Sequence, residues 1–273
     1  MKAFDLLLEW PVDSVAAAAI GPLGTTHRHG PTNDAFALAS VTKLFTAAGI
    51  HLAIEEGSIA IDDELGALIE GDQPRGATVA DVLAHAGGLG PKGDILDDPG
   101  RRRIYSNGGY ELLANLVEQS TGISFAEYLS EGIFEPLGMS TTQLLGSAAH
   151  AGWSTVEDLL RFVNGLPALL APSTVSGMTN PYLPELIGVL PGYGRQTPNV
   201  WGLGPEIRGD KSPHWTGSAN SPRTWGHFGQ AGTFVWVDPS CSVTLIALTN
   251  RRFGEWALQR WPEFADAVRE EVS

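Results

Sequence analysis

The sequence predicts an α+β fold in which a sheet, built from both ends of the chain, is interrupted by an inserted and mainly helical region. Short runs of apolar and β-branched residues, typical of strands, occur near both ends. Between them, from residue 59 to about residue 170, apolar residues recur at helical spacing. We therefore expect an antiparallel sheet domain over residues 1–58 and 200–273, flanked by helices. The inserted helical domain would cover residues 59–199.

The N-terminal part is expected to contain two strands and a helix. The runs Val15–Ile20 and Ala35–Ala39 predict a pair of strands, because Gly, Pro and Thr dominate the segment between them. The segment Ser40–Glu56 predicts a buried helix that ends at Gly57. Its apolar residues share one face: Val41, Leu44, Phe45, Ala48 and Leu52. The first residue of that helix would lie at a strand-to-helix junction.

The remaining elements follow from the same patterns. Helices are expected at Val79–Ala84, Tyr110–Ser120, Phe125–Gly132 and Val156–Leu166. Pro, Gly and Asn dominate Pro181–Asn199, which predicts a long loop. Strands are expected at Trp201–Ile207, Thr233–Val237 and Val243–Thr249, and a closing helix at Trp261–Val272.

The composition excludes several classes of protein. At 273 residues and 29.0 kDa, the chain can bury a large core. Its formal net charge of -14 argues against nucleic acid or an anionic membrane as a partner. The basic run Arg101–Arg103 is expected to be a solvated loop. The single Cys241 excludes an internal disulfide and is expected to be a buried, small apolar residue.

The sequence shows no export signal and no membrane span. The first ten residues carry Asp5 and Glu9 within their apolar patch, and no basic flank precedes a cleavable apolar region. No run of about 18 apolar residues occurs. We therefore expect a cytoplasmic protein, whereas the sequence does not indicate an oligomeric state.

Ser40 and Lys43 form the most informative local pattern. At a spacing of three residues, their side chains share one side of the first helical turn, near the positive end of the helix dipole. A partly desolvated lysine there would lose its proton near neutral pH and could activate the serine as a nucleophile. The alternative is structural, with Ser40 as an N-cap and Lys43 extending to solvent from the helix surface.

Two further clusters follow in the chain, Tyr105-Ser106-Asn107 before a helix and His227-Phe228-Gly229 before a strand. In order and separation, the three clusters resemble the SxxK, YxN and KTG or HxG motifs of class C β-lactamases, serine DD-peptidases and related esterases. Other segments match the same family over nearly the whole chain: Leu83–Leu89, Phe134–Met139, Trp153–Leu159 and the strand ending at Thr249-Asn250.

The resemblance implies a β-lactamase/transpeptidase-like fold and a serine hydrolase that needs no cofactor. Ser40 would attack a carbonyl group and form an acyl-enzyme, with Lys43 as the activating amine. Tyr105 would share the acid and base work, and nearby cations would favour its phenolate form. Whether Lys43 or Tyr105 is the working base is left open by the sequence.

The other motif residues would hold the substrate and the lysine. Asn107 would orient Lys43 or bind a substrate amide, and His227 stands where relatives carry lysine or histidine. By the same resemblance, the oxyanion would be held by the backbone N–H groups of Ser40 and of Gln230, which follows Gly229.

One position departs from the family pattern. Many β-lactamases and peptidases of this family carry threonine at the position of Phe228, where its hydroxyl helps to bind a substrate carboxylate. Phe228 would instead line the site with apolar surface, which suits neutral esters or amides. We therefore expect esterase or amidase activity on a small acyl compound first, β-lactam hydrolysis second and DD-peptidase activity third.

Two alternatives complete the expectations. The chain could be a catalytically silent member that binds a ligand in the same cleft. A metal site has little support, because His27 and His29 lie in an expected hairpin loop without nearby Asp, Glu or Cys partners. His85 matches a family position that we expect to be structural.

Overall fold

The computed structural model describes residues 1–68 and 74–272, so residues 69–73 and 273 of the expected domains lie outside the described part. A six-stranded antiparallel sheet has the order β2-β1-β11-β10-β9-β8. Its strands are β1 (Val15–Ile20), β2 (Thr26–His29), β8 (Glu206–Ile207), β9 (Trp225–Gly229), β10 (Thr233–Asp238) and β11 (Val243–Thr249). Because β1 pairs with β11 over its whole length, the sheet joins both ends of the chain, and the expected fold class is confirmed. The division into two domains stays a prediction.

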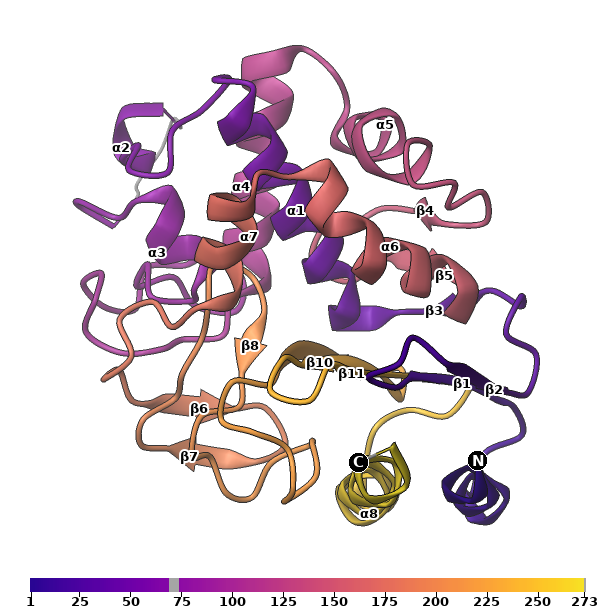
Figure 1. Ribbon diagram of the computed structural model, residues 1–273. Helices are drawn as coiled ribbons and strands as arrows, with labels where there is room; N and C mark the ends of the chain where they lie inside the picture. Colours follow the sequence, from indigo (N-terminus) through magenta and orange to yellow (C-terminus); the bar gives the residue numbers. More distant parts are fainter. Residues whose placement is uncertain (69–73, 273) are drawn as a thin grey trace.

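Alternation along the strands divides the core into two clusters, one on each face of the sheet. In β1, Ala16 and Ala18 belong to one cluster, whereas Ala17 and Ala19 belong to the other. Figure 1 shows helices α1, α4 and α6 over one face of the sheet and α8 over the opposite face. The molecule is therefore a three-layer arrangement with the sheet in the middle.

The helical layer contains α1 (Thr42–Glu55), α2 (Leu65–Leu68), α3 (Val79–Leu83), α4 (Asn107–Thr121), α5 (Phe125–Leu129), α6 (Val156–Leu169) and α7 (Pro172–Thr179). A π-helical turn, η3 (Ser130–Phe134), continues α5. We expected α1 to bury one face, but it is buried almost all round, because α4, α5 and η3 also pack against it. Its first turn therefore lies inside the protein.

The opposite layer contains η1 (Lys2–Glu9) and α8 (Glu255–Val272). The Glu271 carboxylate joins them, because it accepts hydrogen bonds from the backbone N–H groups of Lys2 and Ala3. Helix α8 begins six residues before the expected Trp261. Pro262 lies inside α8, and proline is unfavourable in a helix interior. Burial of Ala257 and Trp261 against the sheet outweighs this local preference.

Two strand predictions are corrected by the pairing. Ala35–Ala39 was expected to pair with β1, but β3 (Phe36–Ala37) pairs with β5 (Gly152–Ser154) in a second sheet, β3-β5-β4. The third strand of that sheet is β4 (Gln143–Leu144). The hairpin partner of β1 is β2, which places His27 and His29 in a strand. Gly24, with φ 75°, permits the tight turn between the two strands.

The segment expected to be a long loop contains a hairpin of β6 (Gly188–Leu190) and β7 (Gly194–Gln196). Each strand has three residues, which is too short to give a strand pattern in the sequence. Of the expected strand Trp201–Ile207, only β8 forms, because the chain turns back so that Trp201 and Glu206 face each other.

The basic run is only partly solvated. Arg101 and Arg102 are exposed, but Arg103 is buried and donates to the carbonyl oxygens of Ala84, Asn199, Tyr182 and Leu183. Burial lowers the pKa of Arg103 to about 10. Arg103 therefore ties three separate segments together, and the expectation of a solvated loop is wrong for this residue.

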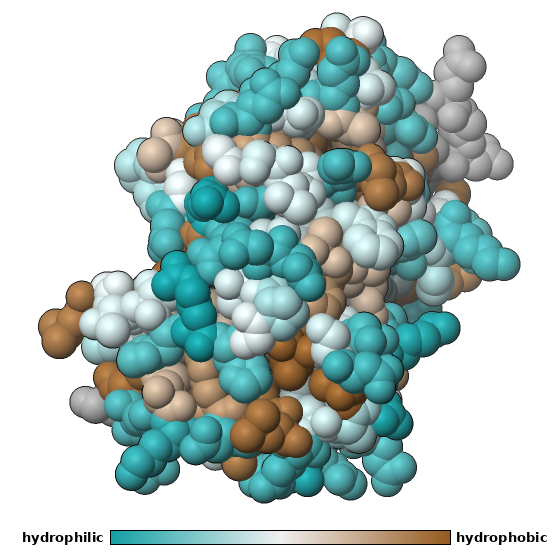
Figure 2. Space-filling model, turned by 90° about the vertical axis from the view of Figure 1, so that its right-hand side faces the viewer, coloured by the Kyte–Doolittle hydropathy of each residue, from teal (hydrophilic) through white to brown (hydrophobic). Residues whose placement is uncertain are grey.

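Hydrophilic residues dominate the face in Figure 2, which lies on the side of β2, β4 and β5, and hydrophobic residues form small separate patches there. Within residues 1–68 and 74–272, no helix is both long and apolar enough to cross a membrane.

The start of α4 depends on a close backbone approach at Gly108. A Cβ atom there would lie 2.2 Å from the backbone nitrogen of Gly93, and a backbone atom cannot swing aside. We expect Gly108→Ala to lower the free energy of unfolding by about 1–3 kcal/mol.

Gly177→Ala is the matched control, because Gly177 lies in α7 and a Cβ atom added there would have nothing within 4 Å. This change should raise stability by about 0.5–1 kcal/mol. Urea denaturation of both variants checks the pair, and equal effects would contradict the assigned contact.

Candidate active site

Ser40 lies in a short 3-10 turn, η2 (Ala39–Val41), immediately before α1. The preceding residue, Ala39, has φ 47°, a left-handed conformation that disfavours a residue with a Cβ atom. Thr42 holds this turn, because its hydroxyl donates to the Ala39 carbonyl at 2.6 Å and accepts from the Gly152 N–H at 2.9 Å. The turn leaves the Ser40 side chain at the edge of a pocket.

Lys43 is completely buried one turn further along. Its Nζ donates to Asn107 Oδ1 at 2.7 Å and to the Ala149 carbonyl at 2.9 Å. Burial lowers the pKa of Lys43 to about 7, although the Glu111 carboxylate opposes the shift. The structural alternative, a lysine that extends to solvent, is therefore excluded, and a large fraction of the amine is neutral near pH 7.

Asn107 occupies the first position of α4, where the helix start fixes it. The hydroxyl of Ser106 caps the helix by accepting from the Gly109 N–H at 2.9 Å, and it donates to the Gly90 carbonyl at 2.6 Å. The N–H of Ser106 donates to Nδ1 of His85 at 3.2 Å. Ser106, the middle residue of the Tyr-Ser-Asn cluster, thus positions Tyr105 and Asn107.

Glu111 is a site residue that the sequence reasoning missed. It lies four residues after Asn107 on α4 and accepts hydrogen bonds from the Ser147 hydroxyl and from the N–H groups of Ala148 and Ala149. It therefore holds the loop whose carbonyl binds Lys43. The spacing of four residues from Asn107, which puts both side chains on one helix face, was the available signal.

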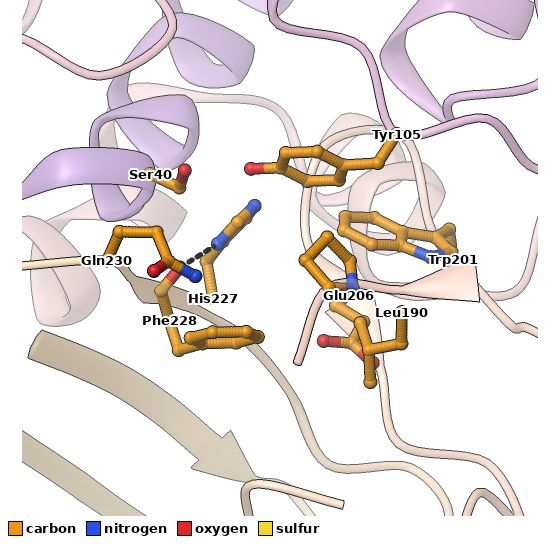
Figure 3. A pocket seen from close by; sticks show the side chains of 9 residues that line it. Ser40, Tyr105, Leu190, Trp201, Glu206, His227, Phe228 and Gln230 are labelled. Atoms are coloured by element: carbon orange, nitrogen blue, oxygen red, sulfur yellow. Dashed lines mark hydrogen bonds between the residues drawn. The ribbon is translucent and has the colours of Figure 1, made fainter. Parts of the chain in front are cut away.

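The hydroxyl of Tyr105 is buried and points toward Ser40 (Figure 3). Burial raises the pKa of Tyr105 above its ordinary value, and the neighbouring Ser40 hydroxyl offsets only part of this rise. The expectation that cations favour the phenolate is therefore wrong, because desolvation dominates. Tyr105 is a neutral phenol at physiological pH.

His227 is held neutral in one tautomer. Its Nδ1 lies 2.7 Å from the Phe228 carbonyl, which can only accept, so Nδ1 carries the proton. Its Nε2 is buried without a hydrogen-bond partner in the described part of the chain. Burial, reinforced by the charge of Lys43, lowers the pKa of His227 to about 3. The site thus contains a histidine that can accept a hydrogen bond at Nε2 and carries no positive charge.

The end of β9 is pressed against the Ser40 turn. A Cβ atom at Gly229 would lie 2.2 Å from the Leu38 carbonyl oxygen, and the Thr233 hydroxyl donates to the same oxygen at 2.7 Å. The N–H of Gln230 makes no hydrogen bond to any described residue. That N–H is therefore available at the pocket, in agreement with an oxyanion role.

These elements enclose a narrow pocket. Its lining contains five of the predicted residues and four others: Ser40, Tyr105, His227, Phe228 and Gln230, with Leu190, Pro191, Trp201 and Glu206. Lys43 and Asn107 are not among the lining residues and lie behind Ser40 and Tyr105. Figure 3 shows His227 and Phe228 on opposite sides of β9, with His227 toward Ser40 and Tyr105.

Glu206 belongs to a buried charged network beneath this pocket. Lys211 Nζ donates to Glu206 Oε1 at 2.7 Å, His214 Nε2 lies 2.9 Å from the same oxygen, and Trp215 donates to Oε2 at 2.6 Å. Burial opposes the charge of Glu206, but Lys211 and His214 more than offset it and hold the pKa of the carboxyl below its usual range. Sequence reasoning missed Glu206, although Lys211 is one of only four lysines.

His85 packs against the Tyr105 ring at 4.5 Å between centroids and is buried. Burial lowers its pKa well below the ordinary value, so His85 is neutral. Its contacts orient Tyr105 and Ser106, as expected for a structural histidine.

Comparison with known proteins decides the family. A family model described as beta-lactamase matches residues 14–269 of the chain. The chain belongs to the β-lactamase family. This confirms the resemblance drawn from the three motifs, and it makes the protein a β-lactamase-family serine hydrolase.

Individual relatives agree with this assignment. A crystal structure of a β-lactamase from Mycobacterium bovis is 47% identical, with a TM-score of 0.94 and coverage of 99% of both chains. Penicillin-binding protein 4* of Bacillus subtilis is 32% identical over 147 residues, which are 44% of this chain and 33% of that protein. A D-aminopeptidase of Brucella anthropi is 31% identical over 139 residues, 41% of this chain and 26% of that protein. The matches span about a third or less of these two curated relatives.

The pKa of Lys43 leads to a pH prediction for this β-lactamase-family protein. A base must be deprotonated, so kcat/KM should rise with pH through about 7. Because the Glu111 carboxylate raises the pKa of Lys43, Glu111→Gln should move this rise to lower pH. The looser loop at Ala149 should also lower the plateau about ten- to hundredfold.

The measurement is kcat/KM against pH for both proteins. Glu131→Gln, an exposed change on the same helical layer, should leave the profile unchanged. A profile of Glu111→Gln that is shifted to higher pH would contradict the assigned electrostatic role.

Tyr105→Phe tests the proton-transfer role of the phenol. The ring remains packed against His85, so the fold should persist, but the rate should fall at least about a hundredfold. Tyr128→Phe is the control, because the Tyr128 hydroxyl bonds to Glu56 in the helical layer. Steady-state kinetics compares the rates of the two variants, and near-ultraviolet circular dichroism checks that both are folded. Near-normal activity of Tyr105→Phe would leave Lys43 as the sole proton acceptor.

Proposed function

We propose that this protein hydrolyses small esters that are uncharged near the scissile bond, through an acyl-Ser40 intermediate. The observation that carries the proposal is the charge of the pocket lining. Among the described residues, no lysine or arginine lines the Ser40 pocket, and its ionised residue is Glu206, a carboxylate. A substrate carboxylate beside the reacting carbonyl would meet a like charge there and no counter-ion.

The third motif supports the same preference. A lysine at position 227 would supply a cation for a substrate carboxylate, whereas His227 is neutral at physiological pH. The amine of Lys43 is already bound by Asn107 and Ala149. β-Lactams and peptides ending in D-alanine carry a carboxylate near the bond that is cleaved, so we rank both below esters and neutral amides.

The geometry suggests a sequence of proton transfers. The neutral amine of Lys43 takes the Ser40 proton, directly or through the Tyr105 hydroxyl, while Ser40 Oγ bonds to the carbonyl carbon. The N–H groups of Ser40 and Gln230 hold the oxyanion, each worth about 3 kcal/mol in comparable enzymes. Collapse breaks the bond to the alkoxide, which leaves as the alcohol with the proton returned from Lys43 or Tyr105. Water then cleaves the acyl-serine by the same route.

The relatives are compatible with this class of reaction. One similar protein is named a D-aminopeptidase, and a structural neighbour of the same fold is described as a hydrolase with promiscuous acyltransferase activity. Amide hydrolysis is therefore the first alternative within the proposal. A silent ligand-binding member remains the alternative from another class.

The test compares a short-chain p-nitrophenyl ester with a penicillin, following released product and the intact mass of the protein. We expect Ser40-dependent ester turnover, with slow or no penicillin adduct. Ser40→Ala should lower ester turnover at least about a thousandfold, whereas Ser58→Ala, beyond the far end of α1, should not change it.

Other outcomes assign a different function. Rapid penicillin turnover would indicate a β-lactamase, and a persistent penicillin adduct would indicate a peptidase-like site. Binding without turnover, equal in the native protein and Ser40→Ala, would indicate the silent binder.

A further inference from the structure

We propose that a groove beside the Ser40 pocket binds the distal part of the substrate, an apolar chain that ends in an anionic group. This inference rests on the proposed function and names the substrate class more closely. It concerns the part of the substrate remote from the bond that is cleaved, whereas the Ser40 pocket receives the uncharged reacting carbonyl.

The groove lies next to the Ser40 pocket, because Tyr105 and Pro191 line both spaces. A substrate that extends from Ser40 beyond these two residues would reach the groove. The groove is several times larger than the Ser40 pocket. The pocket thus fits a small reacting group, and the groove has room for an extended chain.

Backbone pairing builds one wall of the groove. Arg103 and Gly188 form a parallel bridge, which places the chain around Arg103 beside β6. Arg102, Arg103 and Ile104 all line the groove, and the side chain of Arg103 is buried. Ile187, just before β6, and Gly188 and Val189 within it also line the groove.

This wall is apolar and exposed. Val189 has 61% of its surface exposed and Leu96, on the facing loop, has 50%. Both lie in the same groove as Ile104 and Ile187, so the exposed apolar surface is contiguous. Apolar side chains gathered in a concave space next to a reactive group favour an aliphatic chain as the occupant.

Two exposed arginines line the groove, in addition to the buried Arg103. Arg195 is the cross-strand neighbour of Val189 in the β6–β7 hairpin, so both side chains lie on one face. Arg195 is exposed, and its side chain makes no hydrogen bond or ion pair with any residue that the structure describes. Arg102 also lines the groove and pairs with Asp97 at 2.8 Å.

The charge of the groove is opposite to that of the protein. With a net charge of -14, a space lined by two exposed guanidinium groups is not a general property of this surface. A guanidinium binds a carboxylate or phosphate through two parallel hydrogen bonds. The unpaired Arg195 is therefore the expected partner of an anion at the end of the bound chain.

The kinetic test uses matched esters that differ only in a terminal charge. On the acyl side, mono-p-nitrophenyl adipate is compared with p-nitrophenyl hexanoate. On the leaving-group side, the hexanoyl ester of 4-hydroxybenzoate is compared with phenyl hexanoate. The measured quantity is the ratio of kcat/KM for the anionic ester to that for its neutral match, and the pair with the higher ratio identifies which side occupies the groove.

We expect one ratio to exceed 1 in the native protein and to fall about threefold to tenfold in Arg195→Gln. It should fall further in Arg195→Glu and decline as salt is added. Arg101→Gln is the matched control, because Arg101 belongs to the same basic run but does not line the groove, so both ratios should be unchanged. Equal ratios in the native protein and both Arg195 variants would overturn the proposal.

A binding test separates this inference from the proposed function. Octanoate and 1-octanol are titrated into Ser40→Ala by calorimetry, with and without Arg195→Glu. Arg195→Glu should weaken octanoate binding at least about threefold and more than it weakens octanol binding. If the native protein turned over no ester but Arg195→Glu still weakened octanoate binding more than octanol binding, only the proposed function would be defeated. If the native protein turned over esters but Arg195→Glu weakened the binding of octanoate and octanol equally, only the groove assignment would be defeated.

Discussion

The burial of one amine organises the active site. The fall of the pKa of Lys43 from 10.5 to about 7 corresponds to about 5 kcal/mol against the charged form. A buried amine without acceptors would cost still more, so Asn107 and the Ala149 carbonyl are requirements of the fold as much as of the chemistry. Each acceptor has its own support, the Ser106 cap for α4 and the Glu111 carboxylate for the loop.

The second constraint is the boundary between the helical layer and the sheet, which we call the seam. Ser40 comes from the turn that begins α1, whereas His227 comes from β9 and Gln230 from the turn after it. The Leu38 carbonyl joins the two parts through the Thr233 hydroxyl and the close approach of Gly229. The pocket lies at this seam, where the turn before a buried helix meets the end of a strand. Chemistry at the seam depends on both layers being in place.

The sequence predicted the elements whose signals are local. The strand β1 and the bodies of α1 and α4 follow from apolar spacing, and the three motifs identified the residues around Ser40. It could not predict pairing over long distances, so β3 was assigned to the wrong partner and the β6–β7 hairpin was missed. The charge state of Tyr105 was also wrong, because a sequence shows neighbouring charges but not the depth at which a hydroxyl is buried.

The acceptor at residue 149 is a backbone oxygen, and this has a consequence for how the family can diverge. The contact to Lys43 therefore needs no particular side chain at residue 149, although burial keeps that residue small and its N–H must still reach Glu111. Insertion or deletion between Ser147 and Ala151 would displace the oxygen. Selection on this part of the catalytic apparatus therefore acts on loop length, and a comparison of side chains alone would overlook it.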